Sequence, residues 1–236
     1  MIHRTPIFIV TSPRQRVGKT LVARALTEFF HADGREVAAF DANPDQFALV
    51  DYLPADTAVA SVDDTRGQMA LFDQLVQPDR KPKVIDLGHS QFDRFFSVMQ
   101  QIGFAREARV NAVIPVVLFL CDQDARTKQG YAMLRDRFPE LALVPVFNEG
   151  ATQVMRYRMQ FAPTRFGGMP LIIPALSGVV RQVTERPGFS FASYSFNATD
   201  TTTELFGWIK RVFLEFRDLE LRLLLEELKP SLQFHF

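Results

Sequence analysis

The residues with the clearest chemical potential lie near the start of the chain, in the sequence Val17-Gly18-Lys19-Thr20. This order of residue types is typical of a loop that binds phosphate at a helix N-terminus. The lysine contacts the β- and γ-phosphates there, and the hydroxyl is a ligand of Mg²⁺. The candidate cofactor-binding residues are Arg16, Val17, Gly18, Lys19, Thr20 and Leu21. An ordinary strand-to-helix turn is the alternative.

Acidic and amide side chains follow two apolar segments further along the chain. Asp41 and Asn43 come after residues 36–40, and Asp86 ends the apolar segment 83–86. Open α/β sheets bind ligands at the carboxyl ends of their strands, so these side chains are candidates for the same site. Since Mg²⁺ takes carboxylate oxygens, Asp86 is the expected second metal ligand beside Thr20. A solvated turn is the alternative in both places.

The elements around these residues must be a strand before the glycine-lysine loop and a helix after it. Residues 7–10 are apolar and mostly β-branched, which predicts a buried strand. Apolar residues recur at helical spacing after Thr20, which predicts a helix over 20–32. This alternation continues, so we expect an α/β fold with a doubly wound, mostly parallel sheet, helices on both faces and a P-loop.

The remaining elements are predicted from the same periodicities. We expect further strands at 36–40, 83–86, 112–120, 141–147 and 171–174. We expect further helices at 47–54, 66–76, 92–103, 124–138, 177–185 and 201–229. Residues 55–63 read as a polar connection, and Thr201 to Glu204 match a capping box at the start of the last helix. The whole chain, 1–236, is expected to be one domain.

The segment from Val10 to Thr20 resembles the deviant phosphate-binding loop of the ParA/MinD family of ATPases. The family has Val-Thr-Ser-Gly-Lys-Gly-Gly-Val-Gly-Lys-Thr, and this chain has Val-Thr-Ser-Pro-Arg-Gln-Arg-Val-Gly-Lys-Thr. The resemblance implies ATP and Mg²⁺ as cofactors and a homodimer switched by nucleotide. The family's special lysine, which reaches the partner's nucleotide, falls at Arg14.

The resemblance also assigns roles after the second strand. The family has Asp-x-Asp-Pro-Gln there, so Asp41 matches the first acid, Asn43 the second, and Asp45 the glutamine. The catalytic candidates implied are Lys19, Arg14, Asn43 and Asp41. Asn148 matches the family's adenine-contacting asparagine, with a turn residue as the alternative.

Residues 13–16 predict slow hydrolysis. Pro13 lacks an N–H donor, and Gln15 and Arg16 carry a Cβ where the family has glycine. If the loop needs a positive φ at Gln15 or Arg16, the strain is about 1–2 kcal/mol. Asn43 cannot accept a proton where the family has an acid.

Three alternative interpretations of the function stay open. Asp41 to Asp45, Asp64 to Asp73 and Asp86-Leu-Gly-His-Ser-Gln-Phe92 resemble, more loosely, the TraL branch of ParA-like proteins of conjugation systems. A non-catalytic pseudo-NTPase would keep the fold as an interaction module. A dethiobiotin-synthetase-like ligase shares the Val-Gly-Lys-Thr loop.

Composition narrows the possible partners and the location. Lys plus Arg and Asp plus Glu number 27 each, so no net charge favours nucleic acid, although Arg156, Arg158 and Arg165 interleave with aromatic residues. Cys121 is the single cysteine and its neighbours are apolar, which favours a buried structural thiol and a reducing cytoplasm. No apolar run is long enough to span a bilayer, and the last helix has mixed charges, so a membrane role is not expected. A protein partner is expected but not identified.

Overall fold

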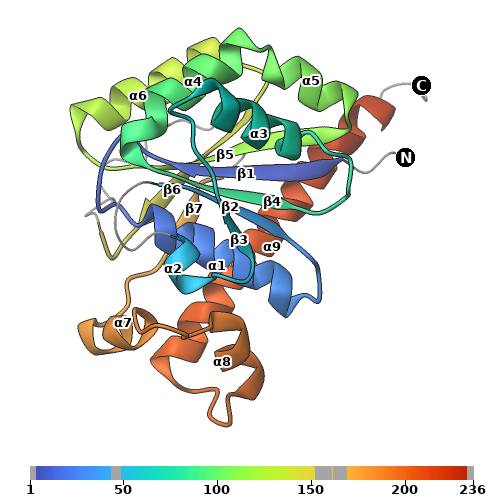
Figure 1. The fold of residues 1–236 in the computed structure, drawn as a ribbon. Coiled ribbons are helices and arrows are strands. Elements are labelled where there is room, and N and C mark those ends of the chain that lie inside the picture. Colours follow the sequence, from blue (N-terminus) through green and yellow to red (C-terminus); the bar gives the residue numbers. More distant parts are fainter. Residues whose placement is uncertain (1–3, 44–48, 152–160, 162–168, 233–236) are drawn as a thin grey trace.

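The computed structural model describes residues 4–43, 49–151, 161 and 169–232 (Figure 1). Within them lies a seven-stranded sheet with strand order β3-β2-β4-β1-β5-β6-β7, and every neighbouring pair is parallel. The strands are β1 Thr5–Thr11, β2 Ala38–Ala42, β3 Thr57–Val59, β4 Lys83–Leu87, β5 Val113–Leu120, β6 Ala142–Asn148 and β7 Leu171–Ile173. Parallel strands require crossover connections, and helices supply most of them.

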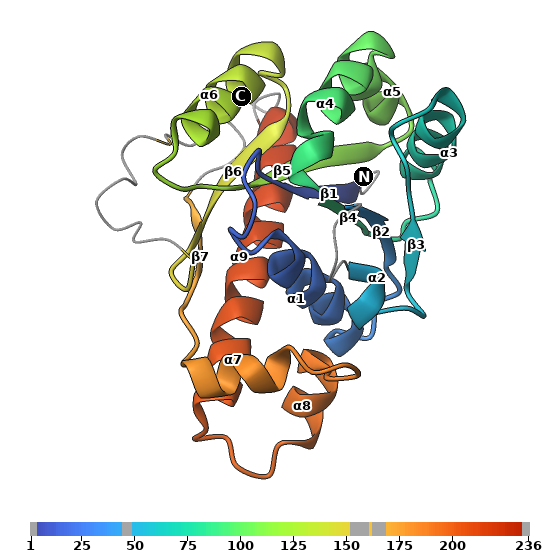
Figure 2. The same ribbon diagram turned by 60° about the vertical axis from the view of Figure 1, so that its left-hand side comes forward.

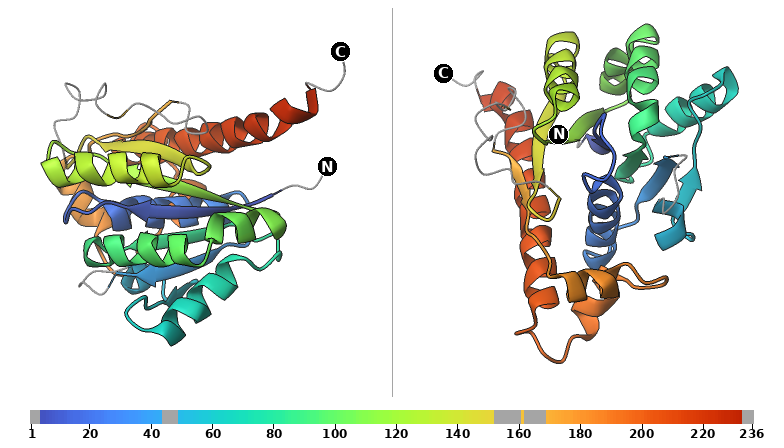
Figure 3. Two further views of the ribbon diagram at one scale, coloured as in Figure 1. Left: turned by 90° about the horizontal axis from the view of Figure 1, so that it is seen from above. Right: turned by 90° about the vertical axis from the view of Figure 1, so that its left-hand side faces the viewer.

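Helices cover both faces of the sheet (Figures 1 and 2). The helices on one face are α1 Lys19–Ala32, α2 Leu49–Tyr52, α7 Gly178–Thr184, α8 Phe191–Asn197 and α9 Glu204–Leu232. Those on the other face are α3 Thr65–Leu75, α4 Phe92–Gln101, α5 Phe104–Val110 and α6 Ala125–Arg137, with a short 3-10 turn at His89–Gln91 before α4. α9 runs along the sheet beside α1 and β7 (Figure 3).

The central strand β1 shows why both faces are closed. Phe8 and Val10 belong to the apolar core beneath α1 and α9, whereas Ile7 and Ile9 belong to the core beneath α4 to α6. All four side chains are fully buried. Because successive side chains of a strand point to opposite faces, a strand buried on both faces reads as a continuous apolar run. The predicted doubly wound α/β fold is therefore confirmed.

Several element predictions need correction. The supposed polar connection at 55–63 contains β3, and two short helices, α5 and α8, were not predicted. The capping box at Thr201 to Glu204 is wrong, because the hydroxyl of Thr203 accepts the backbone N–H of Phe206. The carboxylate of Glu204 instead accepts the backbone N–H of Ser177 before α7, at 2.6 Å. In the described part of the chain, no helix is both long and apolar enough to cross a membrane.

Candidate functional site

The 11–20 loop starts at the end of β1 and leads into α1, so it lies at the carboxyl edge of the sheet. Strand register brings the predicted acids to it, because Val10 of β1 pairs with Asp86 of β4. On the next strand, Asp41 of β2 pairs with the same Asp86. β1 is also a topological switch point, since the chain continues to β2 on one side of it and to β5 on the other. Ligands bind at such points in open α/β sheets.

Thr20 and Asp86, the two predicted Mg²⁺ ligands, lie in direct contact. The hydroxyl of Thr20 donates to Asp86 Oδ2 at 2.6 Å. Asp86 is fully buried, and its other oxygen, Oδ1, has no hydrogen-bond partner among the described residues. Burial raises the pKa of Asp86 to about 7; the charge of Asp41 adds to this, while Thr20 and Lys19 oppose it. A buried carboxylate with an unused oxygen next to a hydroxyl suits a hard cation.

Lys19 and Arg14 both contact oxygens of their own chain. Lys19 Nζ donates to the backbone carbonyl of Arg14 at 2.6 Å. The guanidinium of Arg14 lies 3.4 Å from Asp122 and 3.2 Å from Asp124, measured between nitrogen and carboxylate oxygen. Bound phosphate would therefore have to compete with these oxygens for both cations.

Gly18 and Asn148 hold the loop against the end of β6. Gly18 has φ 96°, and a Cβ placed on it would lie 2.2 Å from Asn148 Nδ2. That amide nitrogen donates to the carbonyl of Val17 at 3.0 Å, and Asn148 Oδ1 accepts the N–H of Gly150. In this arrangement Asn148 supports the loop, and a contact with adenine would need its side chain to leave these partners.

Arg16 adopts the left-handed backbone conformation, in which a residue with a Cβ is strained. Its φ is 57°, whereas Gln15 is not among the described residues with positive φ. The strain predicted for this block therefore falls on Arg16 alone and amounts to about 1–2 kcal/mol. Gln15 instead contacts His89 across the site, with Nε2 atoms 2.7 Å apart.

Asp41 and Asn43 are joined to each other and to the start of α2. Asp41 Oδ1 accepts the backbone N–H of Asn43 at 3.0 Å, and Oδ2 accepts that of Val50 at 2.9 Å. Burial raises the pKa of Asp41, and these hydrogen bonds oppose the shift. Asp41 thus shapes the chain around Asn43, while Asp45 lies outside the described residues.

Asp122 and Asp124 belong to the site but were not predicted as part of it. Asp122 accepts the backbone N–H of Asp124 and the hydroxyl of Thr127, so its carboxylate is fixed at the start of α6. Asp124 caps α6 by accepting the N–H of Arg126 at 2.8 Å. The signal was present in the sequence, because both acids come directly after the strongly apolar segment 112–120.

Other predicted features lie away from this loop or outside the described residues. Arg156, Arg158 and Arg165 fall outside the described part of the chain. Phe161 is buried, and its ring packs against Tyr131 and Phe147, so it is not an exposed surface for base stacking. Cys121 is buried as expected, and burial raises the pKa of its thiol. Two hollows, of about 330 and 1050 Å³, lie beside β3 and at the amino edge of the sheet.

Comparison of the chain with models of known protein families and with curated proteins finds no match. The site is defined by its own residues: a glycine-lysine-threonine turn at the central strand, a buried acid in contact with the threonine, and supports from the ends of β5 and β6. Their oxygen donors fit Mg²⁺, and the lysine and loop amides fit phosphate.

Proposed function

We propose that this protein binds ATP with Mg²⁺ at the 11–20 loop and works as a ParA/MinD-like, nucleotide-dependent dimeric switch that hydrolyses ATP slowly. The observation that carries the proposal is the 2.6 Å contact between the hydroxyl of Thr20 and the buried carboxylate of Asp86. In phosphate-binding loops the threonine hydroxyl and a nearby acid are the protein's ligands for Mg²⁺. An ordinary turn next to an acid would give no reason for that acid to be buried. Asp86 is buried, and its Oδ1 has no hydrogen-bond partner among the described residues.

The proposed roles follow from position and charge. Lys19 binds phosphate oxygens together with the backbone amides of the loop, and Thr20 and Asp86 hold Mg²⁺. Magnesium, when bound, offsets the negative charge of the phosphates and orients them. Arg14 acts across the dimer after leaving Asp122 and Asp124, and its guanidinium can stabilise charge on a transferring phosphoryl group.

Slow turnover is part of the proposal. Pro13 supplies no N–H donor, and Asn43, supported by Asp41, orients water without accepting its proton. Lys19 and Arg14 must also leave oxygens of their own chain. We therefore expect turnover well below the roughly 1–100 s⁻¹ of kinases. A cytoplasmic location fits the buried, free thiol of Cys121.

A thermal melt with and without millimolar ATP and Mg²⁺ tests binding. At a hundredfold excess over Kd, a ligand adds about 2.7 kcal/mol to the free energy of unfolding. For a chain of this size that corresponds to a rise in Tm of roughly 5 °C or more. Lys19→Ala should abolish the rise, and Lys210→Ala, on the exposed side of α9, should retain it. An equal rise in both variants would remove the proposal; ADP and GTP establish nucleotide preference.

Reversion of the loop tests the cause of slow hydrolysis. The revertant carries Pro13→Gly, Arg14→Lys, Gln15→Gly, Arg16→Gly and Asn43→Asp. It regains a donor, a flexible backbone and an acid, so its rate of phosphate release should rise by roughly tenfold, or about 1.4 kcal/mol in barrier. The matched control carries only Asn43→Asp. No gain in a revertant that folds and binds ATP would contradict this account of the loop.

One observation favours the second candidate, a non-catalytic interaction module. Two cations of the 11–20 loop are engaged by the chain itself, Lys19 by a carbonyl and Arg14 by two carboxylates. A loop closed in this way could be purely structural. In that case no nucleotide changes Tm, and Lys19→Ala lowers the stability of the protein whether or not ATP is present.

A further inference from the structure

Helix α9 carries two apolar stripes, and only one of them is used inside the chain. The inner stripe packs against the sheet and α1 and is fully or almost fully buried; it consists of Leu205, Ile209, Val212, Phe216, Leu219 and Leu223. The outer stripe faces solvent and contains Leu214, Leu221 and Leu225, which are 56%, 53% and 59% exposed. A surface helix needs only one such stripe to pack on its own domain.

The spacing of the outer stripe is that of a coiled coil. Its line along the helix is Gly207, Arg211, Leu214, Asp218, Leu221, Leu225 and Leu228. The steps are four and three residues in alternation, which is the a/d pattern of a heptad. At 3.6 residues per turn the three exposed leucines lie within about 40° of one another around the helix. A single exposed leucine on a protein surface is ordinary, but three in one line form a continuous apolar strip on which another helix can pack.

We propose that the outer stripe of α9 is an interface with a second copy of this chain, in which two α9 helices pair antiparallel. In the pairing that aligns the leucines best, Leu214 packs against Leu225 of the other copy. Leu221 then meets the aliphatic part of Asp218. The overlap, residues 211–228, is about 27 Å long.

The charges on α9 favour a second α9 as the partner helix and favour the antiparallel direction of pairing. In a parallel pair, Arg211 and Asp218 on the stripe would each meet their own copy. Like charges so placed are unfavourable. In the antiparallel pair Glu215, whose Oε2 accepts the backbone N–H of Ile172, lies next to Arg222 of the other copy, and symmetry repeats this contact. Arg222 already pairs with Asp218 of its own helix at 3.2 Å, so the row of alternating charge continues across the interface.

This interface is separate from the proposed nucleotide switch. The stripe lies on the solvent side of α9, whereas the 11–20 loop lies at the carboxyl edge of β1. Pairing through α9 therefore needs no nucleotide. A small seam of leucines supports a weak rather than a permanent dimer.

Sedimentation velocity without nucleotide, over a roughly hundredfold range of micromolar protein concentrations, tests the pairing. The wild-type chain should shift from monomer to dimer. Leu221→Glu should raise the dissociation constant at least tenfold by placing a charge in the seam. The matched control is Met69→Glu on α3, which is 61% exposed but off the stripe and should dimerise like the wild type. A monomeric wild type, or dimerisation that survives Leu221→Glu, would overturn the proposal.

Disulfide trapping tests the direction, since Cys121 is buried and does not interfere. A mixture of Leu214→Cys and Leu225→Cys chains should form cross-linked dimers, whereas either variant alone should form few. In the antiparallel pair, two copies of position 214 lie about 16 Å apart along the helix axis, too far for a disulfide. Cross-linking of Leu214→Cys with itself would indicate a parallel pair and contradict the inference. If the protein is a monomer and the thiol of Leu221→Cys is nevertheless protected from alkylation, another part of the same chain covers the outer stripe. That result would contradict the proposed pairing.

Discussion

At the residue scale, the loop is shaped by two positive φ angles that have opposite consequences. Arg16 has φ 57° although it carries a side chain, whereas Gly18 has φ 96° and no space for a Cβ beside Asn148. Replacing Arg16 by glycine would therefore stabilise the protein, whereas replacing Gly18 by any other residue would destabilise it.

Substitution at these two positions should therefore change stability in opposite directions. Arg16→Gly relieves about 1–2 kcal/mol of strain but gives back part of it as chain entropy, so we expect a net gain of about 0.5–1 kcal/mol. Gly18→Ala should lose about 1–3 kcal/mol. Urea denaturation of both variants gives the two values. The reading of the loop is wrong if Arg16→Gly is the more destabilising.

Asp86 makes stability depend on pH. Its pKa in the folded protein is about 7, above the ordinary value near 4, so the folded state holds the proton more tightly than the unfolded chain. The stabilisation from this group is complete below about pH 4 and is lost as the pH rises through 7. Asp86→Asn should thus stabilise the metal-free protein at pH 8, by roughly 2 kcal/mol, and much less at pH 5.

Melts of wild type and Asp86→Asn at both pH values, in EDTA, measure the effect. A stabilising change at a buried acid indicates a residue kept for binding, since natural sites often exchange stability for function. Asp86→Asn should also weaken binding of ATP with Mg²⁺ while sparing metal-free binding. Equal destabilisation at pH 5 and pH 8 would show that Asp86 is a structural turn residue.

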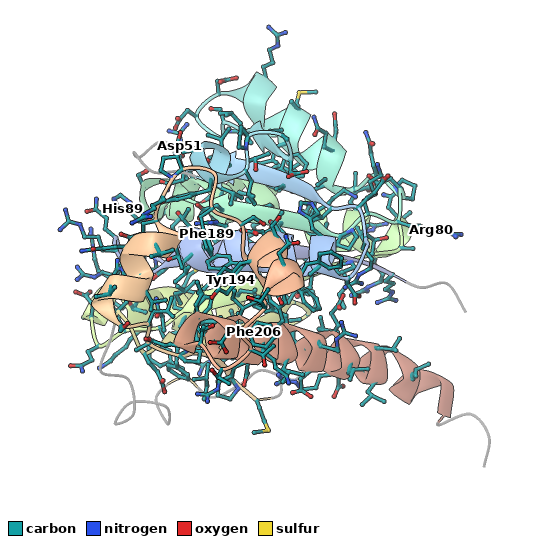
Figure 4. The ribbon with its side chains drawn as sticks, turned by 90° about the horizontal axis from the view of Figure 1, so that it is seen from below. Asp51, Arg80, His89, Phe189, Tyr194 and Phe206 are labelled. Atoms are coloured by element: carbon teal, nitrogen blue, oxygen red, sulfur yellow. The ribbon has the colours of Figure 1, made fainter. Side chains whose placement is uncertain are left out.

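At the element scale, a buried ion pair fastens the α7–α8 segment to α1. Arg24 and Glu28, both buried on α1, pair at 3.1 Å. Arg24 also donates to the carbonyls of Thr184 and Phe189, and Glu28 accepts the hydroxyl of Ser190. In Figure 4, seen from below, Phe189 and Tyr194 mark this segment in front of the sheet. The charges thus specify where the segment docks.

Removal of one partner should be costly. Glu28→Ala leaves the Arg24 guanidinium buried without its counter-ion, so we expect a loss of about 3–5 kcal/mol in unfolding free energy. Glu28→Gln keeps a polar group of the same shape and should lose less. Hydrogen exchange should show residues 184–192 opening more readily in both variants. If Glu28→Ala loses less than 1 kcal/mol, the segment is held mainly by its aromatic contacts, such as Phe191 with Trp208.

The sequence predicted elements with strong periodicity and missed those without it. β1, α1 and α4 were visible because their apolar residues form a pattern over a full element. β3 is an edge strand of three residues, and α5 and α8 have seven residues each, too few to show a period. Turn chemistry such as Gly103 at φ 63°, which separates α4 from α5, depends on the backbone and was read simply as a helix end.

The site was predictable in part, for a related reason. Thr20 and Asp86 follow a local pattern, so their contact could be expected. The pairing of Arg14 with Asp122 and the support of Gly18 by Asn148 join residues more than a hundred positions apart in the chain. Such contacts depend on strand order, and that order becomes known only once the sheet is assembled.

At the scale of the whole molecule, strand order places the earliest strand of the chain in the middle of the sheet. β1 pairs with β4 on one side, where Ile7 matches Lys83, and with β5 on the other, where Ile7 matches Pro115. Neither partner is close in sequence. This strongly apolar strand therefore gains both of its neighbours only from segments more than 70 residues further along the chain.

This strand order has a consequence for folding during synthesis on the ribosome. Translation adds about 5–20 residues per second, so β1 emerges several seconds before β4, its first neighbour in the sheet, exists. During that interval a strand with five consecutive fully apolar residues, Ile7 to Val10 with Pro6 before them, has no native edge to join. Helix α1 follows β1 directly in the chain and forms in microseconds, so its apolar face is the nearest surface against which β1 can pack. Until β4 is made, β1 is thus an apolar segment without the strand neighbours that cover its edges in the folded protein.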